Sequence, residues 1–137
     1  MKYQVTISKT NKTFPIKGLN ELLRAETHTW DARMKKTVVS NKVKSDNDTI
    51  CRIAIQKYLH GVKIDKPIRC HYYIFVKDKM HDRGNVYASL EKSFLDALQQ
   101  KKVIKNDTFD LVFDSVFHTE VDRLNPRIEV IIEEIEE

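Results

Sequence analysis

The chain has 137 residues, of which 32% are charged and 41% hydrophobic, and this length and composition suit one globular domain spanning residues 1–137. The net charge of +4 is unevenly spread: residues 1–80 hold 17 Lys and Arg against 7 Asp and Glu, whereas residues 81–137 hold 7 against 13. Two cysteines without a CxxC pair exclude a disulfide-rich scaffold, and no apolar run approaches the ~18 residues of a membrane span. We therefore expect a soluble, cytoplasmic protein with reduced thiols.

The first half of the chain predicts a strand followed by helical structure. Residues 1–8 alternate apolar and polar side chains, as a half-buried strand does. Leu19 to Tyr58 is predicted to be mainly helical, with a break near residues 27–29 and with Asp48-Thr49 capping its last part. Gly61 is placed to end this helix, because glycine readily adopts the left-handed conformation found at helix C-termini.

The second half predicts three strands and one more helix. Ile68 to Val76 is dense in aromatic and β-branched residues, which indicates a central strand. A helix follows Asp82, and two further strands are expected at Phe109 to Phe117 and Ile128 to Ile135, joined by a turn at residues 122–126. The order β, α, β, α, β, β predicts an α+β domain with a mixed sheet covered by helices on one face.

The helix after Asp82 has two distinct faces. Apolar residues at spacings of three and four form its buried stripe: Val86, Leu90, Phe94, Ala97 and Leu98. Steps of about 100° per residue gather four polar residues on the opposite face: Asn85, Ser89, Lys92 and Asp96. After the helix, a turn at Asn106-Asp107 is expected to bring Asp107 back beside Asp82.

Each polar residue of this region also has an ordinary structural explanation. Asp82 can cap the helix, Lys92 and Asp96 can form an i,i+4 ion pair, and Asn106-Asp107 can be a simple turn. The combination of two flanking acids with an amide and a lysine on one face is typical of a metal-dependent phosphodiesterase site.

Three segments, in this order, resemble the signature of the RusA-type Holliday junction resolvases, small endonucleases of phages and prophages. They are Asp82-Arg83-Gly84-Asn85, Lys92-Ser93-Phe94-Leu95-Asp96-Ala97-Leu98 and Val103-Ile104-Lys105-Asn106-Asp107. Residues 18–36 are similar to the amino-terminal segment of the Gram-positive phage members, and residues 125–130 resemble their last strand. The resemblance covers most of the chain and implies the RusA-like fold, a homodimer and a role in recombination and repair in the host cytoplasm.

The resemblance also implies the site residues. The family's pattern is Asp-x-Asp-Asn, then a lysine, then a later acid, and its matching positions here are Asp82, Asn85, Lys92 and Asp107. The second acid of the pattern falls on Gly84, which is a departure. In this interpretation Asp82 and Asp107 bind Mg²⁺, with Mn²⁺ as the alternative metal and Asp96 as a further carboxylate. Lys92 stabilises the charge of the transition state, and Asn85 positions a ligand or phosphate.

The DNA contacts are assigned to the basic first half of the chain. The segment similar to the family lies near the junction, and Arg or Lys suits phosphates, so we expect contacts from four side chains: Arg24, Arg33, Lys35 and Lys36. Two alternatives stay open beside the nuclease. One is a branched-DNA-binding relative whose catalysis is weakened or lost because of Gly84. The other is a dimeric structural or interaction protein with an incidental polar helix face.

Overall fold

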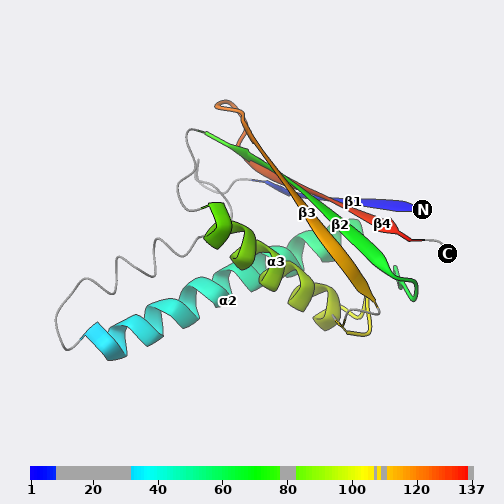
Figure 1. Ribbon diagram of the computed structural model, residues 1–137. Helices are drawn as coiled ribbons and strands as arrows, with labels where there is room; N and C mark the ends of the chain where they lie inside the picture. Colours follow the sequence, from blue (N-terminus) through cyan, green and yellow to red (C-terminus); the bar gives the residue numbers. More distant parts are fainter. Residues whose placement is uncertain (9–31, 78–82, 107, 109–110, 136–137) are drawn as a thin grey trace.

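The computed structural model describes residues 1–8, 32–77, 83–106, 108 and 111–135, and Figure 1 shows their arrangement. These residues form two helices and four strands, in the predicted order β, α, β, α, β, β. The elements are β1 (Lys2–Ser8), α2 (Ala32–Tyr58), β2 (Ile68–Val76), α3 (Arg83–Gln100), β3 (Val112–Val121) and β4 (Arg127–Glu134).

The four strands form one mixed sheet in the order β1-β4-β2-β3. Strand β4 is antiparallel to both β1 and β2, whereas β2 and β3 run parallel. A parallel pair needs a crossover connection, and α3 is the helix of that connection. Both helices lie against the same face of the sheet (Figure 1). The chain is thus an α+β domain, as predicted.

The core lies between the sheet and the two helices, and α3 contributes a continuous stripe to it. The five apolar residues predicted for the buried stripe of this helix are all at most 8% exposed. The fully buried Tyr72 of β2 joins the layers, because its ring lies edge-on to Phe94 of α3 at 5.8 Å and stacks on Phe117 of β3 at 4.8 Å. Burial of this stripe fixes the rotation of α3, so its polar face points away from the sheet.

Helix α2 runs without interruption from Ala32 to Tyr58, so the cap predicted at Asp48-Thr49 is wrong. The earlier part of the predicted helical stretch, residues 19–31 with the break near 27–29, lies outside the described residues. The Thr49 hydroxyl donates to the carbonyl of Ser45, one turn earlier in the same helix, and Asp48 is only 8% exposed. Gly61 follows the helix end with a φ of +78°, in agreement with its predicted role.

The bounds of three strands follow the predictions closely. β1 begins one residue later than predicted, β2 has the predicted bounds, and β4 begins and ends one residue early. β3 was predicted at Phe109–Phe117 but occupies Val112–Val121, because its pairing with β2 continues to the contact of Val76 with Val121. Neither described helix is both long enough and apolar enough to cross a membrane.

Candidate functional site

The polar face of α3 is present as predicted. Asn85 and Ser89 are half-buried, and the side chain of Lys92 is 62% exposed. The ammonium nitrogen of Lys92 lies 3.4 Å from a carboxylate oxygen of Asp96, whose side chain is 19% exposed. The structure therefore brings Lys92 and Asp96 together as the i,i+4 pair that the ordinary explanation predicts. An exposed pair of this kind leaves the lysine able to exchange its carboxylate for a phosphate.

The spacing along α3 separates Asn85 from Lys92. Seven residues at 1.5 Å each place their Cα atoms about 10 Å apart along the axis, on nearly the same face. The two side chains therefore suit neighbouring phosphates, or a phosphate and a metal ligand, better than a single atom.

Gly84 is the second residue of α3 and is exposed. A Cβ atom built on it meets no atom within 4 Å, and the first turn of α3 contains no acidic residue. The departure from the family's pattern is thus not imposed by crowding. An aspartate at this position has room in the described structure, and its charge suits a helix N-terminus.

The two predicted metal-binding acids, Asp82 and Asp107, lie outside the described residues, but their neighbours in the chain are placed. Arg83 opens α3, which is 18 residues and thus roughly 27 Å long. Beyond the C-terminal end of α3, the amide of Ile64 donates to the carbonyl of Val103 at 2.7 Å. The amide of Ile68 donates to the carbonyl of Leu111, also at 2.7 Å. These bonds attach the described residues Val103 and Leu111 to the residues that lead into β2, whereas α3 begins at Arg83, after the end of β2. The expected return of Asp107 beside Asp82 falls outside the described residues and stays a prediction.

The remaining predicted residues are only partly covered by the structure. Arg33, Lys35 and Lys36 belong to the first turns of α2, but their side chains are outside the described part, as is all of Arg24. Within the described ranges, no group of three or more His, Cys, Asp and Glu side chains is arranged to hold a metal ion. The assignment of Mg²⁺ to Asp82 and Asp107 stays a prediction.

No known protein family and no curated protein matches this sequence. The resemblance to the RusA-type resolvases accordingly depends on the motif residues alone and stays a prediction.

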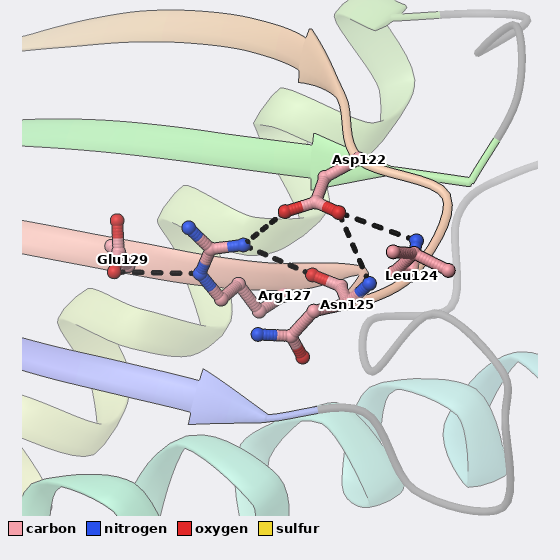
Figure 2. Close-up of polar contacts among 5 residues, drawn as sticks. All are labelled: Asp122, Leu124, Asn125, Arg127 and Glu129. Atoms are coloured by element: carbon pink, nitrogen blue, oxygen red, sulfur yellow. Dashed lines mark hydrogen bonds and ion pairs between the residues drawn. The ribbon is translucent and has the colours of Figure 1, made fainter.

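A hydrogen-bonded β3–β4 turn, predicted at residues 122–126, lies beside the end of β2 (Figure 2). One carboxylate oxygen of Asp122 accepts the amides of Leu124 at 3.3 Å and Asn125 at 3.1 Å, and the other accepts a 2.8 Å bond from Arg127. These bonds, that of Arg127 foremost, hold the pKa of Asp122 below its ordinary value. The amide of Asp122 also donates to the carbonyl of Val76, which joins the turn to the end of β2.

The two cysteines have no place in this chemistry. Cys51 and Cys70 are both buried and form no disulfide, as predicted. Burial raises the pKa of each thiol to about 12, so neither is a reactive thiolate near neutral pH.

Proposed function

We propose that this protein is a magnesium-dependent endodeoxyribonuclease that cuts four-way and related branched DNA as a homodimer, in the manner of the RusA-type resolvases. The observation that carries the proposal is the arrangement of the motif on α3. Its lysine and amide occupy the face turned away from the core, and its two acids flank the helix in sequence.

The chemistry is hydrolysis of a phosphodiester. Mg²⁺ bound at this site supplies an activated water and offsets the charge that builds on the phosphate oxygens. Asp82 and Asp107 are the residues that would hold it, since Mg²⁺ prefers carboxylate oxygens and keeps several of its waters. Lys92 stabilises the developing charge, Asn85 orients a phosphate oxygen, and Asp96 keeps Lys92 in position through their ion pair.

We infer that this site is built from two copies of the chain. Roughly 27 Å of helix separates Arg83, the residue after Asp82, from Gln100 at the C-terminal end of α3, and this separation favours an arrangement in which the two acids of one metal site come from different copies. A two-fold axis that sets two α3 helices antiparallel brings Asp82 of each copy to the partner subunit's Asp107. Such a dimer contains two equivalent sites, which suits paired cuts in a two-fold junction.

The first test is cleavage of a labelled four-way junction with Mg²⁺, with linear duplex of the same sequence as the control. Asp82→Asn and Asp107→Asn should each abolish the paired cuts. Co-expression of the two inactive variants then tests the shared site, because each mixed dimer combines one doubly substituted site with one intact site. Random mixing makes half of the dimers mixed, so about a quarter of the wild-type number of sites returns. Recovery of no activity would show that each site belongs to one chain.

A second candidate function is favoured by Gly84, which stands where the family's pattern has a metal-binding acid. In that case the protein binds branched DNA and no longer cuts it. Tight junction binding without cleavage under Mg²⁺ or Mn²⁺ would establish this alternative. Failure to bind branched DNA at low salt would leave a dimeric structural or interaction protein.

A further inference from the structure

A groove lined by lysines lies at the C-terminal end of α3, where the segment after this helix meets the connection between α2 and β2. Its volume is about 560 Å³. We call it the lysine groove, and its described lining residues are Lys63, Ile64, Asp65, Gln99, Lys102, Val103, Ile104 and Lys105.

The floor of the lysine groove is fixed to the core. The side chains of Ile64, Val103 and Ile104 are at most 4% exposed. The amide of Ile64 donates to the carbonyl of Val103 at 2.7 Å, and the amide of Val103 donates to the carbonyl of Leu98 at 2.9 Å. A ligand in this groove therefore meets a preformed surface, which lowers the entropic cost of binding.

Lys102 has a left-handed backbone conformation, which is unfavourable for a lysine. Its φ is +60°, and among the residues that the structure describes it is the one non-glycine with a positive φ. Its amide bonds to the carbonyl of Gln99 at 2.9 Å, which together with the bond from Val103 to Leu98 forms a Schellman motif with Lys102 at C′. Glycine is the usual residue there, because a side chain in the left-handed region is strained. A strained lysine at the edge of a groove indicates a use for its charge.

The charges around the groove point to a polyanion. Lys63, Lys102 and Lys105 are all exposed, and Asp65 is the one acid among the described lining residues. The exposed Lys101 adds a further positive charge next to Lys102. The groove ends at Lys105, which precedes the predicted metal ligand Asp107 by two positions in the sequence.

We propose that the lysine groove binds the phosphate backbone of a DNA arm. This inference builds on the proposed function and adds a contact surface distinct from the basic residues of α2. Each ammonium group that contacts a phosphate displaces a condensed counterion, so its contribution falls as the salt concentration rises.

The test is the salt dependence of binding to a labelled four-way junction, measured without metal so that no cleavage occurs. Lys63→Gln and Lys105→Gln should each lower affinity about five- to tenfold near 0.1 M salt and reduce the slope of log K against log salt by about 0.9. Lys2→Gln is the matched control, because Lys2 is an exposed lysine whose ion-pair partner, Glu133, lies on β4. Slopes for the groove variants equal to that of the control would overturn the proposal.

Lys102→Gly separates the DNA contact from any structural role. Relief of backbone strain should raise Tm by about 2–5 °C, while loss of the ammonium group lowers junction affinity about five- to tenfold. A variant that is more stable and binds as tightly as the wild type would overturn the role of Lys102. Wild-type protein that binds no junction at low salt would instead overturn the proposed function and, with it, the groove. If the wild type binds the junction tightly but the groove variants keep the wild-type salt dependence, only the role of the groove is overturned.

Discussion

Restoring the missing acid with Gly84→Asp is the sharpest single test of how α3 and the metal are coupled. The position is exposed and has no atom within 4 Å of a built Cβ, so the aspartate enters without displacing anything in the described structure. It places a negative charge in the first turn of α3, which contains none. Replacing glycine in a helix contributes about 0.3–0.5 kcal/mol, and the charge at the helix N-terminus about 0.3–1 kcal/mol more.

Two circumstances determine how this gain is measured. Asp82 lies two residues earlier, and its like charge opposes the new carboxylate unless a cation is present. The helix contribution is therefore measured without metal in proteins that also carry Asp82→Asn. There, the free energy of unfolding with Gly84→Asp should be higher than with the neutral Gly84→Asn by about 0.3–1 kcal/mol. With about 3–5 °C per kcal/mol for a chain of this size, this corresponds to roughly 1–5 °C in Tm.

The metal contribution is measured with Asp82 intact. Mg²⁺ should raise the Tm of Gly84→Asp more than that of Gly84→Asn, because a metal that binds the folded state better stabilises it further. The same variant should cut the junction faster than the wild type. An equal Mg²⁺-induced shift in the two variants would refute the idea that position 84 faces the metal. No difference between them in the Asp82→Asn background would refute the charge argument at the start of α3.

Three further predictions concern single side chains. Lys92→Gln should change the free energy of unfolding by no more than about 0.5 kcal/mol, since it removes one exposed i,i+4 ion pair. The same variant should lower the rate of junction cleavage about 100-fold. A loss of activity that only matches a loss of folded protein would contradict the catalytic role of Lys92. The pKa of Asp122 is lowered in the folded state, so its contribution to stability is present above its ordinary pKa of 3.8 and disappears as the pH falls through the folded value. Denaturant melts should therefore show a weaker loss of stability on acidification in Asp122→Asn than in the wild type. Both thiols should resist a thiol reagent in the native protein and react only after unfolding, because each is buried with a pKa of about 12.

Local patterns in the sequence were sufficient for most of the fold. The bounds of β2 follow from its density of aromatic and β-branched residues, and the buried stripe of α3 follows from its periodicity alone. The end of α2 near Gly61 was also predictable, because glycine is the usual residue at such a position. Each of these signals depends on residues that are close in the sequence.

The wrong predictions concern features that are determined by contacts between distant parts of the chain. A capping pattern at Asp48 and Thr49 cannot reveal that the surroundings bury Asp48 within a continuous helix. The end of β3 depends on its partner β2, which lies about 45 positions earlier in the register. The lysine groove could not be predicted from the sequence. Its residue Lys102 has a positive φ, and the usual sequence indicator of a positive φ is a glycine.

The order of the sheet has a consequence for how the protein is made. β4 comes last among the described strands but lies between β1 and β2, so β1 lacks its partner strand and β2 can pair only with β3 until residues 127–134 leave the ribosome. Until then, β1 and one edge of β2 expose unpaired backbone groups that invite aggregation. Pairing of β1 with β4 also closes a loop of more than 100 residues, and such non-local contacts slow folding. A nascent chain stalled on the ribosome before β4 is synthesised should therefore remain sensitive to protease. Once β4 has left the ribosome, the sheet should form in one cooperative step.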